Sequence, residues 1–324
     1  MTETTYLQSI TTTLAETMRV DPRVLVLGED VAEGGPWGAT AGLADEFGTE
    51  RVRNTPISEA AICGIAIGAA QSGLRPVVEI MFIDFLTLAL DQLVNQAAKA
   101  HFMSGGQLQV PLVLRTQGGA GQRGGAQHSQ SLEAWLTHVP GLKVAMPSTA
   151  ADVAGLLVAA IADPNPVVFV ENKTLYFRKE GIRDTREPVL LGHARVVRPG
   201  RDVTVVALSR LVGDSVAAAD ELAEEGIEVE VIDPRSLVPL DLDTIVESVK
   251  KTGRIVTVEE GWRQSGVGAE IAAQVVEHAF DWLDAPVLRV TGKDVPMPYA
   301  ANLEKLTLPS VAEVVEAVKA VCYR

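Results

Sequence analysis

The sequence predicts an α/β protein with two domains: a first domain built around a parallel sheet with helices on both faces, and a smaller α/β domain. Short apolar runs bounded by turn residues alternate with longer helical patterns, an order typical of parallel sheets. The chain has 324 residues, of which 47% are hydrophobic, and domains usually hold about 100–200 residues. A charged stretch at residues 174–199 interrupts the alternation. We therefore expect a first domain at residues 1–185, a linker at 186–199 and a smaller second domain at 200–324.

Apolar runs and helical periodicity locate the elements of the first domain. We expect strands at residues 24–27, 76–80, 110–115, 142–145 and 167–170, and helices at 7–20, 59–71, 84–105 and 149–162. Ser58 is a good N-cap for the helix at 59–71. This helix consists almost entirely of Ala, Ile, Gly and Cys, so we expect it to be buried on all sides.

The second domain repeats the alternation. Strands are expected at residues 203–208, 227–232, 254–258 and 287–290, and helices at 214–225, 241–250, 268–280 and 310–321. In both domains, strands separated by helices indicate parallel pairing.

Composition excludes several classes of protein. The 28 basic and 42 acidic residues give a net charge of −14, so a chain that coats nucleic acid or an anionic membrane is not expected. Two cysteines, Cys63 and Cys322, cannot build a disulfide framework. No apolar run approaches the roughly 20 residues of a membrane helix, and the N-terminus lacks a secretory signal. We expect a bacterial cytoplasmic protein.

Two carboxylates of the first domain are candidate functional residues. Glu29 comes soon after the strand at 24–27, and Glu59 begins the helix at 59–71. Ligands of α/β sheets bind at the carboxyl ends of strands, and a carboxyl in an apolar wall can hold a proton near neutral pH. Plainer interpretations remain open: Glu29 as a solvated loop residue, and Glu59 as a carboxylate favoured by the helix dipole.

A glycine-rich segment at residues 117–130 follows the strand at 110–115 and presents His128. It is not a phosphate-binding loop, because no Gly-Lys-Ser/Thr follows, and it lacks the Gly-x-Gly-x-x-Gly pattern of dinucleotide folds. A histidine on a loop above a parallel sheet is well placed for acid–base chemistry. A purely structural histidine is the alternative.

The end of the helix at 149–162 could hold a cation. Its last carbonyls carry the negative end of the helix dipole, and Asp163 and Asn165 add side-chain oxygens. Such a set of oxygens suits a hard cation. The alternative is a polar turn that ends the helix at Pro164 and Pro166.

Many separate motifs resemble those of one known family. They are Asn54-Thr-Pro-Ile-Ser-Glu59, Gly73-Leu-Arg-Pro-Val77, Asp84-Phe85, Met103-Ser-Gly-Gly106, Gln127-His-Ser-Gln130, Pro140-Gly-Leu-Lys-Val144, Asn165-Pro-Val-Val168, Val258-Glu-Glu-Gly-Trp262, Gly266-Val-Gly-Ala-Glu-Ile271 and Pro296-Met-Pro-Tyr-Ala300. The set resembles the β subunit of the thiamine diphosphate-dependent decarboxylating component of 2-oxoacid dehydrogenase complexes, over nearly the whole chain. The resemblance implies a transketolase-like pyrimidine-binding domain followed by a transketolase C-terminal domain.

The resemblance also implies roles for residues at matching positions. Glu59 is similar to the catalytic glutamate that hydrogen-bonds the aminopyrimidine ring of the cofactor, and His128 to a catalytic histidine that faces the substrate and the lipoyl group. The other matches are the cofactor-binding positions Glu29, Ile57, Met81 and Phe85, and the potassium ligands Leu112, Ala160, Ile161, Asp163 and Asn165, mostly through main-chain carbonyls.

One expected motif is missing. The chain has no Gly-Asp-Gly followed some thirty residues later by Asn, the family pattern that holds diphosphate through Mg²⁺. The resemblance therefore implies that a separate α subunit supplies the Mg²⁺-diphosphate half of the site in an α2β2 heterotetramer. It also implies docking to a lipoyl-bearing dihydrolipoamide acyltransferase.

Several functions remain open at this point. Pyruvate is the most expected substrate, with acetoin and branched-chain 2-oxoacids as alternatives, because residues 117–123 depart from the pyruvate pattern. A non-catalytic scaffold that keeps only the fold is a further alternative, as is an independent α/β enzyme or flavin-binding electron carrier. The combination of Glu59, Phe85 and His128 argues against a scaffold.

Overall fold

A computed structural model describes residues 2–182 and 189–324. The chain divides into two compact units: Met1–Gly118 with Trp135–Leu191, and Gly119–Ala134 with Gly192–Arg324. The second division falls within α5 (Glu133–Thr137). The domain boundaries expected at residues 185 and 200 stay predictions, and Arg183, Asp184, Arg186 and Glu187 of the expected charged connection lie outside the described residues.

A parallel sheet forms the centre of the first unit. Its strands follow the order β6–β7–β5–β4–β2–β3, and every neighbouring pair is parallel. Their bounds are β2 Val24–Gly28, β3 Val52–Asn54, β4 Arg75–Ile80, β5 Val113–Gly118, β6 Lys143–Ala145 and β7 Val167–Asn172. A separate antiparallel pair joins β1 (Thr2–Thr5) to β8 (Lys179–Ile182).

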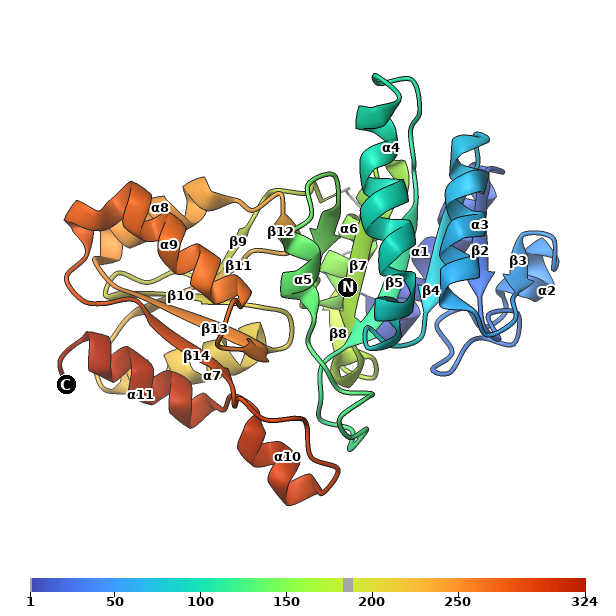
Figure 1. The fold of residues 1–324 in the computed structure, drawn as a ribbon. Helices are drawn as coiled ribbons and strands as arrows, with labels where there is room; N and C mark the ends of the chain where they lie inside the picture. The colour runs from blue at the N-terminus through green and yellow to red at the C-terminus, as the bar shows by residue number, and fades with distance from the viewer. Residues whose placement is uncertain (1, 183–188) are drawn as a thin grey trace. The chain divides into compact units, whose positions relative to one another are not determined.

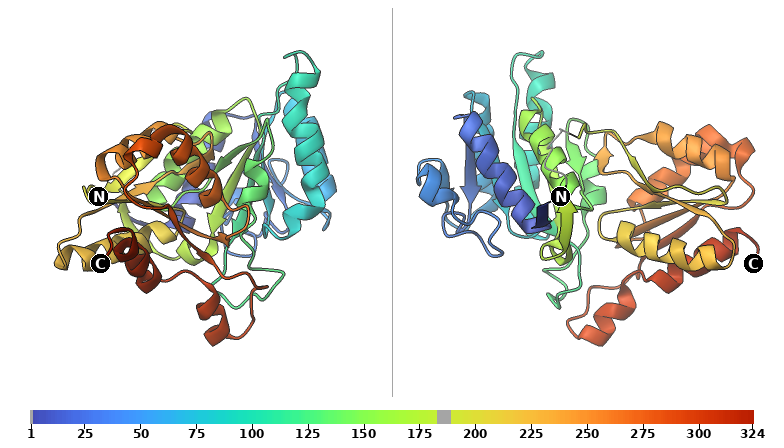
Figure 2. Two further views of the ribbon diagram at one scale, coloured as in Figure 1. Left: turned by 60° about the vertical axis from the view of Figure 1, so that its left-hand side comes forward. Right: turned by 180° about the vertical axis from the view of Figure 1, so that it is seen from behind.

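Helices cover both faces of this sheet (Figures 1 and 2). On one face α1 (Tyr6–Val20) packs against α6 (Ala150–Ala162). On the other face α3 (Glu59–Gln71) packs against the one-turn helices η1 (Phe85–Ala89) and η2 (Gln92–Ala97), which lead into α4 (Ala98–Met103). The short α2 (Leu43–Phe47) and η3 (Lys173–Leu175) complete this unit.

The second unit contains a mixed sheet. Its strand order is β14–β13–β10–β11–β9, parallel except for β9, which is antiparallel to β11. Helix α7 packs against α11, and α8 packs against α9. The bounds are α7 Leu211–Glu224, α8 Leu242–Thr252, α9 Val267–Ala279, η4 Phe280–Trp282, α10 Ala301–Thr307, α11 Val311–Val321, β9 Arg195–Arg198, β10 Val203–Ala207, β11 Val229–Asp233, β12 Ser236–Val238, β13 Ile255–Trp262 and β14 Leu288–Gly292.

Three local expectations in the first unit were wrong. The helix expected at 84–105 is interrupted, changing from a 3₁₀ turn through a π turn to α4. Strand β5 begins three residues later than expected, because Pro111 has no N–H and the Leu112 N–H bonds back to the Val110 carbonyl. Helix α3 is not buried on all sides, since Gly64, Ile65 and Gly68 are exposed in this chain.

The α/β fold class expected from the sequence is confirmed by the two sheets and the helices packed against them. Among the described residues, no helix is both long and apolar enough to cross a membrane.

Candidate functional site

The carboxyl ends of β3, β2 and β4 bring the expected cofactor residues to one edge of the sheet. Gly28, the last residue of β2, pairs with Asn54 of β3 and with Glu79 of β4. The Thr55 N–H donates to the Gly28 carbonyl at 2.9 Å. A Cβ on Gly28 would lie 2.9 Å from the Glu79 carbonyl oxygen, so only glycine fits this close approach. Three segments therefore leave the sheet side by side: the one that contains Glu29, the one that leads to Glu59, and the one that follows β4.

Glu59 occupies the first turn of α3 and is 9% exposed. Ser58 stands at the N-cap as expected, but its side chain makes no capping hydrogen bond. No described residue forms a hydrogen bond or ion pair with the Glu59 carboxylate. A largely buried carboxylate without a donor is open to accept or share a proton with a ligand.

The negative charge of Glu59 contributes to raised pKa values at two neighbouring residues. The pKa of Glu29 is raised above its usual value, mainly by partial burial and then by the nearby Glu59 and Asp30 carboxylates. Burial, with a further contribution from Glu59, raises the pKa of the Cys63 thiol to about 12. The structure thus gathers Glu29, Glu59 and an inert buried thiol at the start of α3.

Three apolar residues expected to contact the cofactor lie on the segments that leave this edge of the sheet. Met81 and Phe85 are half-buried, and Ile57 is 81% exposed. The rings of Phe82 and Phe85 meet edge to face at 5.8 Å between centroids. The buried Lys173 places its ammonium 5.2 Å from the Phe82 centroid. A flat heteroaromatic ring with a basic nitrogen fits this combination of apolar surface and free carboxylate.

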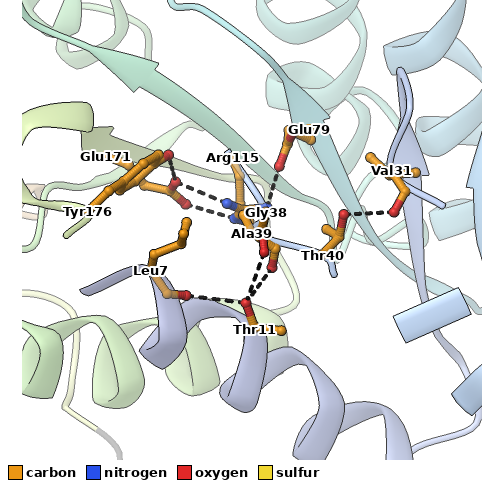
Figure 3. Close-up of polar contacts among 10 residues, drawn as sticks. All are labelled: Leu7, Thr11, Val31, Gly38, Ala39, Thr40, Glu79, Arg115, Glu171 and Tyr176. Atoms are coloured by element: carbon orange, nitrogen blue, oxygen red, sulfur yellow. Dashed lines mark hydrogen bonds and ion pairs between the residues drawn. The ribbon is translucent and has the colours of Figure 1, made fainter. Parts of the chain in front are cut away.

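A buried ionic network, which the sequence analysis missed, lies beneath this edge (Figure 3). Arg115 donates Nε and Nη2 to Glu171 at 2.7 and 3.0 Å, and Nη1 to Glu79 at 2.7 Å. Tyr176 donates to Glu171 at 2.5 Å. Two carboxylates thus share one guanidinium, and burial raises the pKa of Glu79. The signal in the sequence was charged residues inside otherwise apolar strands.

The network also supports the loop after Glu29. A Cβ on Gly35 would lie only 2.8 Å from Glu79 Oε1, so this loop rests directly on the Glu79 carboxyl group. Thr40 donates to the Val31 carbonyl at 2.7 Å, and Thr11 of α1 donates to the Ala39 carbonyl at 2.9 Å. These contacts hold the loop in place at both ends (Figure 3).

His128 belongs to the second unit, on the loop Gly119–Ala134. It is half-buried, and Gly124 packs against its backbone so closely that a Cβ there would lie 2.9 Å from the His128 carbonyl oxygen. Glu304 of α10 accepts the backbone N–H groups of Gly121 and Arg123 at 3.0 and 2.9 Å. The loop that presents His128 is therefore tied to its own unit through backbone hydrogen bonds.

Comparison with known proteins agrees with this architecture. Residues 2–179 match the family "Transketolase, pyrimidine binding domain", and residues 192–314 match "Transketolase, C-terminal domain". The pyruvate dehydrogenase E1 component subunit beta of Rhizobium meliloti (strain 1021) is 54% identical over all of this chain and 71% of its own length. The chain belongs to the pyruvate dehydrogenase E1 β subunit family.

Other members of this E1 β family align over nearly their whole length. The subunit from Rickettsia felis is 52% identical over 96% of this chain and 95% of its own. The mitochondrial beta-2 subunit of Oryza sativa subsp. japonica is 50% identical over 99% of this chain and 87% of its own length. A solved "Split gene transketolase, inactive beta4 tetramer" shares 25% identity with a TM-score of 0.81, covering 98% of both chains. These relatives confirm the resemblance and favour the pyruvate type over the acetoin and branched-chain alternatives.

The expected potassium ligands gather at the opposite edge of the sheet, before β5 and β7. Leu112 precedes β5, and its carbonyl accepts the Val167 N–H at 2.8 Å. Arg75 donates to the Ile161 carbonyl at 2.5 Å, and Lys143 pairs with Asp163. Asp163 also accepts from the Asn165 backbone and side-chain amides at 2.9 and 3.1 Å. Cationic side chains therefore lie on two of the oxygens that potassium would use, and the site stays a prediction.

The second unit holds a carboxyl pair that the sequence analysis also missed. Glu133 and Glu259 are 2% and 1% exposed, and a Cβ on Gly261 would lie 3.5 and 3.6 Å from an oxygen of each. Burial, the main cause in each case, raises the pKa of Glu133 to about 8 and that of Glu259 to about 7. Glu259 accepts the Val267 and Gly268 N–H groups at the start of α9, both at 2.9 Å.

Proposed function

We propose that this chain is the β subunit of a thiamine diphosphate-dependent pyruvate dehydrogenase component. In this proposal it decarboxylates pyruvate oxidatively and transfers the acyl group to lipoamide, in the bacterial cytoplasm and only together with an α subunit. The observation that supports it best is the Glu59 carboxylate, which lies largely buried and without a donor at the carboxyl edge of the sheet. Family membership supports the same conclusion.

The residues of the first unit fit the aminopyrimidine half of the cofactor. When bound, thiamine diphosphate supplies a nucleophilic carbon and an electron sink for decarboxylation. Glu59 would share a proton with the ring nitrogen beside Glu29, whose pKa is raised by partial burial and by the charges of Glu59 and Asp30. Ile57, Met81 and Phe85 would hold the ring against their apolar surfaces.

Partner subunits would complete the site. The chain lacks the diphosphate motif, so an α subunit would hold the Mg²⁺-diphosphate half in an α2β2 assembly. The exposed Gly64, Ile65 and Gly68 of α3 support this, since a partner chain would cover them. His128 would serve the transfer to a lipoyl-bearing acyltransferase. Potassium would have a structural role. Its ligands would be Leu112, Ala160, Ile161, Asp163 and Asn165.

The test is Glu59→Gln in the reconstituted α2β2 enzyme. Gln has nearly the same shape but cannot share a proton, so folding and assembly should persist while hydrogen–deuterium exchange at C2 of the bound cofactor falls more than tenfold. A tenfold loss is about 1.4 kcal/mol of barrier. Glu247→Gln, on the exposed surface of α8, is the matched control. Exchange within tenfold of the unmodified enzyme would mean that Glu59 is structural and would favour the scaffold alternative.

A further inference from the structure

Gln117 is a buried amide that folding leaves without partners. It lies near the carboxyl end of β5 and is 1% exposed. Neither its Oε1 nor its Nε2 has a hydrogen-bond partner among the described residues. Its main chain, by contrast, is used: the Gln117 carbonyl accepts the Ile83 N–H at 2.9 Å.

The register of the sheet shows what surrounds this side chain. β5 lies between β4 and β7. In the register of the sheet, Arg115 lies opposite Glu79 of β4, and Gln117 lies opposite Glu171 of β7. Side chains two residues apart share a face of the sheet, so Gln117 lies on the face of the Arg115 network, one step nearer the carboxyl edge. β4 ends at Ile80, just before Met81, and the backbone hydrogen bond from Ile83 to Gln117 joins β5 to the segment that follows β4. Gln117 therefore lies beside the segment that carries the expected cofactor contacts Met81 and Phe85.

A buried amide without partners destabilises the folded chain, because both of its polar atoms lose their hydration and gain nothing in return. An apolar side chain of similar length would fill the same space without that loss. Residues that lower the stability of the folded chain are expected at sites where a protein binds a ligand or catalyses a reaction. The carboxyl edge of a parallel sheet is also where such folds bind their ligands.

We propose that Gln117 is a substrate contact: its amide turns toward the carboxylate of the bound 2-oxoacid and donates a hydrogen bond from Nε2. The inference rests on the proposed function and adds a specificity residue to it. A neutral donor suits a decarboxylation, because the carboxylate charge disappears as CO₂ leaves. A cation at this position would stabilise the ground state more than the transition state.

The experiment compares Gln117→Met with the unmodified protein in the reconstituted α2β2 enzyme. Met keeps the length and removes both orphaned polar atoms. We expect kcat/KM for pyruvate to fall about 10- to 100-fold, while the Tm stays the same or rises and the Kd for thiamine diphosphate changes less than twofold. Gln274→Met is the control: it removes a half-buried amide on α9 that donates to Glu270 at 2.7 Å, and it should leave all three values unchanged.

Three results would overturn the inference. A higher Tm with kcat/KM within twofold would make Gln117 an orphaned amide without a ligand. A cofactor Kd that changes in step with kcat/KM would make it a cofactor contact. If Gln117→Met fails to assemble, Gln117→Asn keeps the amide but shortens its reach, and unchanged kinetics in that variant would contradict the contact. Failure of the proposed function is distinct, because the unmodified enzyme would then turn over no pyruvate.

Discussion

Replacing Glu133 by Gln should flatten the dependence of stability on pH. Glu133 is 2% exposed, its Oε2 has no hydrogen-bond partner among the described residues, and its pKa is raised from 4.5 to about 8. Burial is the main cause, and the charges of Glu259 and Glu260 add to it. Because the folded state binds this proton more tightly than the unfolded state, the stabilisation is complete below pH 4.5. It is lost as the pH rises towards 8.

The size of the effect follows from the two pKa values. At 1.36 kcal/mol per pKa unit, the gap corresponds to about 5 kcal/mol between acid and alkaline pH. Gln keeps the shape and does not titrate, but its buried amide costs about 1–3 kcal/mol. We therefore expect Glu133→Gln to be less stable than the unmodified chain near pH 5 and about 2–4 kcal/mol more stable near pH 9.

Urea unfolding of the full chain at several pH values measures this directly. Glu277→Gln, at an exposed position on α9, is the control and should follow the unmodified chain at every pH. If the curves for Glu133→Gln and the unmodified chain run parallel from pH 5 to 9, Glu133 does not hold its proton through burial. The reasoning about the carboxyl pair would then be wrong.

Two further predictions concern the proposed sites. His128→Ala should lower reductive transfer to a lipoyl domain by about 10²–10⁴-fold and lower decarboxylation with an artificial electron acceptor only modestly; equal losses in the two assays would place His128 before the transfer step. Potassium should raise the Tm of the assembled enzyme as expected for a ligand that binds only the native state, and Asp163→Ala should abolish that dependence. A Tm that is independent of potassium in the unmodified enzyme would show that Arg75 and Lys143 already satisfy these oxygens.

The sequence predicts most of the apolar framework well. β2 is a continuous apolar run, β4 is apolar between Arg75 and Glu79, and α3 and α6 follow small-residue or apolar periodicity, so local patterns suffice to locate them. Prediction failed at the polar end of β5. β5 continues through Thr116, Gln117 and Gly118, beyond the strand expected at 110–115, although residues from 117 on were expected to form a glycine-rich loop. The edge strand β9, whose residues alternate only weakly in burial, was expected as part of a connection.

The candidate site was only partly predictable for a similar reason. Glu29 could be singled out because it follows the expected strand at 24–27, and Glu59 because it begins the expected small-residue helix at 59–71. The Arg115 network joins three strands that are far apart in the sequence, so its pairing is invisible until the sheet order is known. The same holds for Glu133 and Glu259, which belong to segments more than a hundred residues apart.

Cofactor binding with and without an α subunit tests the central claim most directly. Calorimetry with thiamine diphosphate and Mg²⁺ on the chain alone should show only weak binding and no pyruvate turnover, because the diphosphate motif is missing. Adding the α subunit should produce tight binding and pyruvate-dependent activity together. Micromolar, Mg²⁺-dependent binding by the chain alone, or an α2β2 assembly that binds the cofactor but does not turn over pyruvate, would contradict the account.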